Sequence, residues 1–126
     1  MSSIAEQGYG QVARQTASPR QIEFRLLTSI ASQLDAADPS TVEGARKLAE
    51  AVYRNTELWS TLLVDITSTG NQLPNELKSG LLSLARYSVT TGPKVLSGEE
   101  KPQALSDVNR AVAQGLAAAA AASQAA

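Results

Sequence analysis

The sequence predicts an all-α protein, a single-domain bundle of four to five helices with a central helical hairpin. Hydrophobic residues make up 43% of the 126-residue chain but aromatic residues only 4%, so the core must consist mainly of aliphatic side chains and alanine. This composition suits helix-on-helix packing better than a β-sandwich, which is richer in β-branched and aromatic residues. Apolar residues recur at helical spacing between breaks that contain Pro, Gly and Asn. We divide the domain, residues 1–126, into an N-terminal arm (1–17), a bundle body (18–96), and a hinge with a C-terminal helix (97–126).

The N-terminal arm carries only weak helix signals. Ile4, Tyr9 and Val12 share a short segment, but each of its two glycines disfavours a helix by about 1 kcal/mol relative to Ala. Two interpretations stay open: a frayed arm, or an arm that docks through these three side chains.

A helix start is expected at Ser18, an N-cap residue followed by Pro19 at the first helical position. Gln21 completes a capping box, and the helix should run to about Ala36. Its predicted apolar face consists of Ile22, Leu26, Leu27, Ile30 and Leu34.

The first helix of the hairpin should follow the break at Pro39, with Ser40 as N-cap and Glu43 as its capping-box partner. It should reach Thr69, about 40 Å at 1.5 Å per residue, and stop at Gly70 in the left-handed conformation. Its predicted apolar stripe comprises Val42, Ala45, Leu48, Ala49, Val52, Asn55, Trp59, Leu63 and Ile66. The pairs Glu43–Lys47 and Glu50–Arg54 should hold a solvated face and neutralise its basic residues.

The second helix of the hairpin should begin near Pro74 and face the first, because the break between them is short. Its wide apolar face suggests contact with two neighbours, which would make it the most central helix. Thr90–Pro93 should end or kink it, with a last turn through Lys94–Leu96 as an alternative. The stripe that faces its partner comprises Leu77, Leu81, Leu84 and Ser88.

An exposed hinge is expected at residues 97–102, followed by a helix from about Gln103. A narrow apolar seam on this helix is typical of docking in a groove, either on this protein or on another. The seam comprises Leu105, Val108, Val112 and Leu116. The Ala-rich last ten residues favour helix by propensity but bury little, so we expect them to fray.

The residue inventory argues against an enzyme. The chain contains no Cys and no His, which excludes disulfides, thiol nucleophiles, the usual zinc sites and the commonest general base. No phosphate loop, metal spacing or paired carboxylates suggest a cofactor or a catalytic site. No apolar run has the length of a membrane span, and no basic stripe with stacking aromatics favours nucleic acid. We therefore expect a cytoplasmic protein that recognises other proteins.

Asn55 and Trp59 are the unusual members of the central stripe. Asn55 is interpreted as a buried amide that bonds to loop backbone near Asn71, and Trp59 as a core anchor. The alternative is that both line a groove for a partner helix, because Trp and Leu anchors carry most helix-in-groove binding.

Several blocks of the chain carry a family resemblance. They are Ser18–Glu23, Asn55–Trp59, Leu62, Asp65, Asn71–Lys78, Leu81–Ala85, Asp107–Ala111 and Gly115–Leu116. In this order the blocks resemble FlaF, the flagellar biosynthesis regulator of alphaproteobacteria, over residues 8–116. The resemblance implies a helical cytoplasmic protein required for flagellin production, which acts as a flagellin secretion chaperone and opposes the regulator FlbT. An alternative is a post-transcriptional regulator that acts on flagellin mRNA directly or through FlbT.

A partner-binding surface follows from this reading as a hypothesis. Flagellin is the expected partner, through an amphipathic terminal helix, and FlbT is a further candidate. The C-terminal seam is expected to occupy the groove when flagellin is absent, or to form part of it. The candidate residues are Asn55, Trp59, Leu62, Leu73, Leu77, Leu81, Leu105, Val108, Val112 and Leu116.

Overall fold

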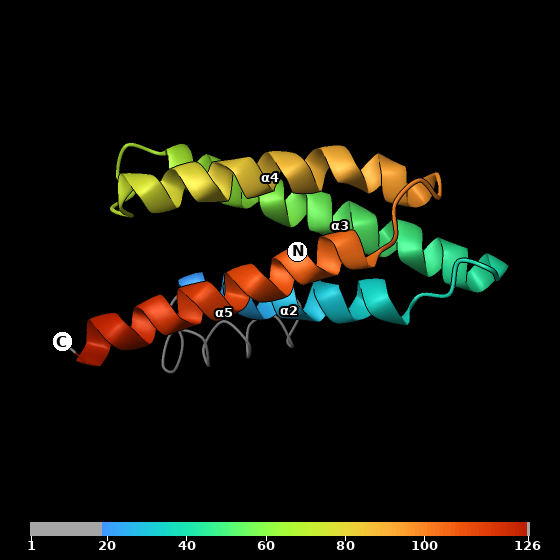
Figure 1. Cartoon of the computed structure of the whole chain (residues 1–126), viewed down its shortest axis with the longest axis horizontal. Coiled ribbons are helices and arrows are strands. Elements are labelled where there is room, and N and C mark those ends of the chain that lie inside the picture. Colours follow the sequence, from blue (N-terminus) through green and yellow to red (C-terminus); the bar gives the residue numbers. More distant parts are fainter. Residues whose placement is uncertain (1–18, 126) are drawn as a thin grey trace, which may run out of the picture.

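The computed structural model describes the backbone of residues 19–125 and the side chains of residues 22–116. This part of the chain consists of four α-helices and the turns between them, without a β-strand (Figure 1). The helices are α2 (Pro19–Ala36), α3 (Val42–Thr67), α4 (Asn75–Leu96) and α5 (Gln103–Ala125). The prediction of an all-α bundle with a central hairpin is confirmed. The predictions for the N-terminal arm and for Ser18 fall outside the described residues.

The four helices form two packed pairs. α4 lies along α3, and α5 lies along α2, as Figure 1 shows. Contacts between α2 and α3 join the pairs, and a smaller contact joins α4 and α5. The prediction that the second hairpin helix is the most central was therefore wrong. α4 packs mainly on α3 and leaves part of its wide apolar face half-buried.

Helix α2 begins at Pro19 and ends at Ala36, as the sequence predicts. Leu27, Ile30 and Leu34 of its predicted apolar face are buried. Leu26 lies between α2 and α3 and is not buried: 43% of its surface remains exposed. The pattern identified the apolar side chains but did not reveal where the neighbouring helix stops covering them.

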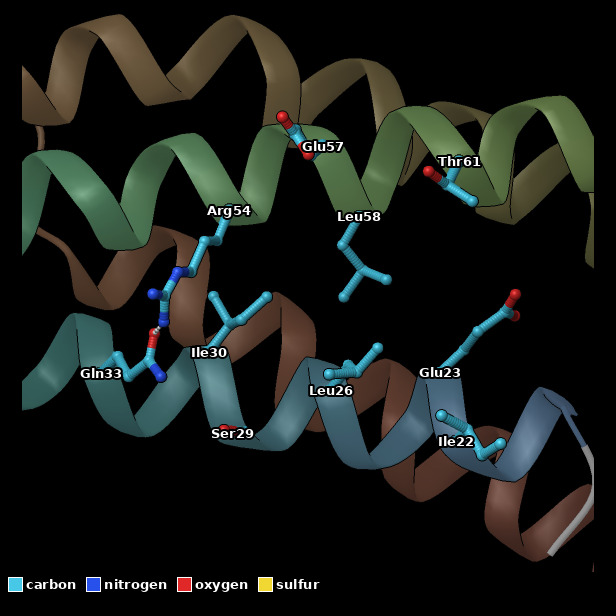
Figure 2. Close-up of a pocket in the computed structure, with 10 residues that line it drawn as sticks. All are labelled: Ile22, Glu23, Leu26, Ser29, Ile30, Gln33, Arg54, Glu57, Leu58 and Thr61. Carbon is cyan, nitrogen blue, oxygen red and sulfur yellow. Dashed lines mark hydrogen bonds between the residues drawn. The ribbon is translucent and has the colours of Figure 1, made fainter. Parts of the chain in front are cut away.

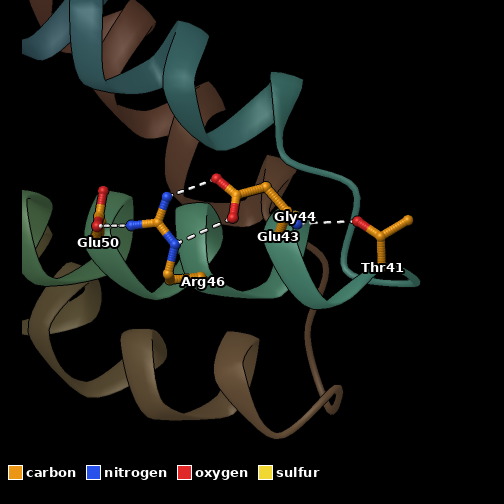
Figure 3. Close-up of polar contacts among 5 residues, drawn as sticks. All are labelled: Thr41, Glu43, Gly44, Arg46 and Glu50. Atoms are coloured by element: carbon orange, nitrogen blue, oxygen red, sulfur yellow. Dashed lines mark hydrogen bonds and ion pairs between the residues drawn. The ribbon is translucent and has the colours of Figure 1, made fainter.

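The N-terminus of α3 differs from the prediction. Thr41, not Ser40, is the N-cap: its Oγ1 accepts a hydrogen bond of 2.9 Å from the Gly44 backbone N–H (Figure 3). The Ser40 hydroxyl instead donates to Asp38 Oδ1 at 2.7 Å. Gly44 is required here, since a Cβ at this position would lie 1.7 Å from the Asp38 carbonyl oxygen.

The solvated face of α3 also pairs differently from the prediction. Arg46 bridges Glu43 and Glu50 at 2.5 Å each, so the expected pairs with Lys47 and Arg54 do not form (Figure 3). Arg46 lies between the two carboxylates at i−3 and i+4, which allows one guanidinium to serve both. The local neutralisation that the sequence predicts is thus achieved by other partners.

The buried stripe of α3 is shifted from the predicted one. Val42 at the helix start is 91% exposed and Leu63 is 38% exposed. The buried residues are Gly44, Leu48, Ala51, Val52, Asn55, Leu58, Trp59, Leu62 and Ile66. The helix ends at Thr67, where Ser68 caps it and donates its N–H to the Asp65 carbonyl.

The predicted left-handed stop at Gly70 was wrong, because the positive-φ glycine among the described residues is Gly98, at φ 84°. Gly98 follows α4, which continues through Pro93 to Leu96. Pro93 lies in the last turn, where a missing N–H removes a single helical bond, so the alternative last turn forms. The exposed hinge and the start of α5 at Gln103 agree with the prediction.

Candidate partner-binding groove

Asn109 of α5 inserts its amide into the core between three helices. Trp59 Nε1 donates to Asn109 Oδ1 at 2.9 Å. Asn109 Nδ2 donates to Asn55 Oδ1 at 2.7 Å and to the Leu27 carbonyl at 3.3 Å. All three polar side chains, Trp59, Asn55 and Asn109, are fully buried. Because an indole N–H can only donate, it orients the Asn109 amide, which in turn orients Asn55.

The predicted partner of Asn55 was therefore wrong. Its amide binds Asn109 on α5 and not the loop backbone near Asn71, whose carbonyl accepts instead from Lys78 Nζ at 2.8 Å. A chain of buried amides separated by more than fifty residues in sequence cannot be paired from sequence spacing. Trp59 is a core anchor, with 0% of its surface exposed.

A second polar cluster fastens α5 to the end of α2. Ser106 Oγ donates to Asp35 Oδ1 at 2.6 Å, and Arg110 pairs with Asp35 Oδ2 at 2.6 Å. Burial acts to raise the pKa of Asp35, but the bonds from Ser106 and Arg110 outweigh it and hold this pKa below its usual value of 3.8. Asp35 is therefore a carboxylate at neutral pH, and its charge helps to fix the position of α5.

The C-terminal seam covers the region around Asn55 and Trp59. Leu105, Val112 and Leu116 are buried and Val108 is half-buried. In this state no surface at Trp59 is open to a partner. Asn55, Trp59 and Leu105 thus support the bundle from inside, and their part in binding stays a prediction.

An apolar groove remains open between α4 and α5, which contact each other less than the other neighbouring helices do. Its volume is about 330 Å³. Leu77 and Leu84 line it half-buried, and Glu76 is the charged residue among the described residues of the lining. The described residues that line the groove are Glu76, Leu77, Gly80, Leu81, Leu84, Ala111, Val112, Gly115 and Leu116.

Four of the predicted site residues meet in this α4–α5 groove. They are Leu77, Leu81, Val112 and Leu116. Leu62 and Leu73 border a narrow crevice that shares Leu81, Val112 and Leu116 with the groove. The pattern of leucines therefore places much of the predicted surface together, although α5 and not α3 provides its second wall.

Sequence reasoning did not include Gly80 or Gly115 among the site residues, although both line the groove. A Cβ added at either glycine would meet no atom within 4 Å, so both open onto free space. A glycine inside a helix costs up to about 1 kcal/mol relative to Ala. A glycine inside a predicted helix, away from any turn, is therefore unfavourable unless it has another role. This could have identified Gly80 and Gly115 as candidate site residues.

The sequence model of a family described as "Flagellar protein FlaF" matches residues 5–116 of the chain. The chain belongs to the FlaF family. No curated protein and no solved structure matches it.

FlaF-family membership makes the chain a flagellar protein, as its resemblance implied. Within the part that the structure describes, no helix is long and apolar enough to cross a membrane. The same residues contain no cluster of acidic side chains suited to a metal ion. The α4–α5 groove is thus the feature of this FlaF-family structure in which several predicted site residues meet on an open surface.

Proposed function

We propose that this FlaF-family protein binds flagellin as a secretion chaperone and thereby promotes flagellin synthesis and export. The α4–α5 groove is its binding surface, and an amphipathic terminal helix of flagellin is the ligand. The observation that carries the proposal is an open, almost wholly apolar groove on a member of a flagellar family. Apolar stripes on unassembled flagellin would self-associate, and covering one of them prevents this.

The shape of the groove suits a helix. Its wall on α4 runs from Glu76 to Leu84, about 12 Å at 1.5 Å per residue, which accommodates two turns of a partner helix. Gly80 and Gly115 leave space on either side, so a partner backbone can approach closely. Leucine and valine walls then receive apolar residues at i, i+3 and i+4, the pattern of helix-in-groove recognition.

The test is to fill the groove without changing the core. Gly80→Leu and Gly115→Leu each add a side chain where the structure has free space. We expect either variant to fold and to bind flagellin at least about tenfold more weakly, a loss of roughly 1.4 kcal/mol. Binding is measured by co-purification and by titration with purified flagellin. Gly70→Leu is the matched control, because Gly70 also has free space but lies in the α3–α4 loop.

Two results would contradict the proposal. One is undiminished flagellin binding by both folded groove variants. The other is retention of flagellin mRNA leader or FlbT instead of flagellin, which would favour the regulatory alternative. Salt separates these outcomes further, because binding to an RNA backbone weakens steeply with salt and an apolar helix contact does not.

A further inference from the structure

A second groove lies between α2 and α3 and shares no lining residue with the α4–α5 groove. Its volume is about 540 Å³. Figure 2 shows Leu26 and Ile30 of α2 and Leu58 of α3 pointing into the gap between the two helices. Ile30 and Leu58 are buried, whereas 43% of the Leu26 surface stays exposed. Leu26 therefore offers an apolar surface to solvent within this groove.

Arg54 closes one end of the α2–α3 groove. Figure 2 shows its side chain crossing from α3 toward α2, where Nη1 donates to Gln33 Oε1 at 3.3 Å. Gln33 is neutral, and Arg54 forms no ion pair with a residue that the structure describes. A guanidinium carries five N–H donors and binds a carboxylate through two parallel hydrogen bonds. Arg54 can therefore accept a carboxylate from a partner.

A second cation lies directly beyond Arg54. A smaller pocket of about 290 Å³ shares Arg54 and Gln33 with the groove, and Lys47 and Glu50 also line it. Glu50 already pairs with Arg46 at 2.5 Å. Lys47, by contrast, has no ion pair among the described side chains. The end of the groove at Arg54 is thus a basic end.

The acidic residues of the groove lining lie elsewhere. Glu57 points away from the gap in Figure 2, and its carboxylate contacts the Tyr53 hydroxyl at the surface. Glu23 lies toward the end of the groove opposite Arg54. The groove therefore combines apolar side chains along its length with positive charge at one end.

We propose that the α2–α3 groove binds an amphipathic helix of a partner protein that carries Asp or Glu side chains in its last turn. The apolar face of this helix covers Leu26, and its acidic side chains replace Gln33 as the partner of Arg54. The negative end of a helix dipole lies at the C-terminus, so this direction also places that end beside Arg54 and Lys47. Charge complementarity thus specifies the kind of occupant and its direction, parallel to α2.

The dimensions of the groove suit about three helical turns. At 1.5 Å per residue, the α2 wall from Ile22 to Gln33 spans about 17 Å and the α3 wall from Arg54 to Thr61 about 10 Å. A partner helix of about 12 residues covers this length. Apolar residues at i, i+3, i+4 and i+7 of the partner then lie along Leu26. The inference does not depend on what the α4–α5 groove binds.

The first experiment titrates the full-length protein with a labelled synthetic peptide and follows fluorescence anisotropy. The peptide has about 14 residues, blocked ends, leucines at i, i+3, i+4 and i+7, and glutamates in its last turn. A second peptide has lysines in place of these glutamates. We expect the glutamate peptide to bind at least about tenfold more tightly than the lysine peptide, because only the first presents carboxylates to the basic end.

Two substitutions test the apolar and the charged part of the groove separately. Leu26→Asp should weaken binding of the glutamate peptide at least about tenfold, because it places a charge against the apolar face of the peptide. Arg54→Glu should reverse the preference, so that the lysine peptide binds more tightly. Leu63→Asp and Arg86→Glu are the matched controls at exposed positions outside the groove, and both should bind like the unaltered protein. Circular dichroism verifies that each variant remains helical.

Failure of the unaltered protein to bind the glutamate peptide would overturn the proposal. Equal binding of the two peptides, or an unchanged preference in Arg54→Glu, would do the same. Sedimentation tests a different occupant: a dimer of the unaltered protein that Leu26→Asp converts to monomers would assign the groove to a second copy of the chain.

The second experiment measures amide hydrogen exchange and shows which groove the peptide occupies. With the glutamate peptide in excess, residues 22–33 and 54–61 should exchange at least about threefold more slowly, while residues 76–84 stay unchanged. Gly115→Leu, which fills the α4–α5 groove, should bind the peptide as the unaltered protein does. Slowing confined to residues 76–84, or loss of peptide binding in Gly115→Leu, would refute the α2–α3 site.

Discussion

Asn109 is the residue at which the packing of α2, α3 and α5 converges. A buried amide that is left unpaired costs about 1–3 kcal/mol, so each of its bonds constrains how α5 can sit. Apolar contacts alone would tolerate a shift of α5 along α2. The pairing with Trp59, Asn55 and the Leu27 carbonyl tolerates one register.

Trp59→Phe tests how much the hydrogen bond from Trp59 to Asn109 contributes to stability. The substitution keeps an aromatic ring but removes the indole N–H, which leaves Asn109 Oδ1 buried without its donor. We expect the free energy of unfolding to fall by roughly 2–4 kcal/mol, from the lost bond and the smaller ring together. Urea denaturation measures the change.

Tyr53→Phe is the matched control for this substitution. Tyr53 is exposed on α3, and its hydroxyl contacts Glu57 at the surface. Its replacement should change the free energy of unfolding by less than about 0.5 kcal/mol. If both variants unfolded at the same urea concentration, the buried bond would contribute nothing to stability.

At the scale of the elements, the start of α3 and the end of α4 depend on different physical features. At the start of α3, the Thr41 hydroxyl accepts a hydrogen bond from the Gly44 backbone N–H. Gly44 also has no Cβ, which allows the Asp38 carbonyl of the preceding turn to lie close to it. α4 ends where Gly98 adopts a positive φ and accommodates the reversal of the chain. Glycines inside the walls of the α4–α5 groove serve neither purpose.

Two alanine substitutions separate these kinds of glycine. Gly44→Ala forces its Cβ against the Asp38 carbonyl oxygen and should destabilise the fold by roughly 1–3 kcal/mol. Gly80→Ala meets free space and should stabilise α4 by about 0.5–1 kcal/mol through its higher helix propensity. Thermal unfolding of both variants measures the difference. An equal effect of the two substitutions would mean that the turn before α3 yields easily.

At the scale of the whole molecule, two tightly packed helix pairs leave two grooves at their margins. α5 packs on α2, and α4 packs on α3, so the α4–α5 and α2–α3 boundaries close incompletely. The position of α5 decides how wide the α4–α5 groove is. Asp35 is one of the groups that hold it there, through Ser106 and Arg110.

Stability should therefore depend on pH through Asp35. Its pKa in the folded chain lies below the usual 3.8, so the unfolded chain binds the proton more readily. The resulting stabilisation is complete well above pH 3.8 and disappears as the pH falls through the folded-state pKa. Asp35→Asn should be less stable than the unaltered protein at pH 7, and the difference should shrink below about pH 4.

Denaturant unfolding at a series of pH values measures this difference. Asp107→Asn provides the control, because Asp107 is exposed on α5, the helix that Asp35 contacts through Ser106 and Arg110. A gap between Asp35→Asn and the unaltered protein that stays constant from pH 7 to pH 3 would show that the carboxylate charge is not what holds α5.

The part of the candidate site that the sequence predicts depends on residues close together in the chain. The part that it does not predict depends on contacts between residues far apart in the chain. The leucines of the α4–α5 groove follow from helical periodicity, a local property of about two turns. The bond between Asn55 and Asn109 joins residues on different helices, and no local pattern specifies it. The cap at Thr41 was missed for a smaller reason, since two adjacent hydroxyl residues compete and only the geometry of the turn selects one.

The sequence by itself determined the all-α class, the approximate bounds of the four helices, and the resemblance to a flagellar family. The class and the helices follow from residue spacing, turn residues and composition, which act within a few residues along the chain. The family follows from the resemblance of the ordered sequence blocks, which the family match confirms. The tertiary structure alone decided that α5 seals Trp59 and that the open apolar surfaces lie between α4 and α5 and between α2 and α3. The physical reason is that periodicity shows which face of a helix is apolar, whereas the partner of that face is chosen by contacts between distant segments.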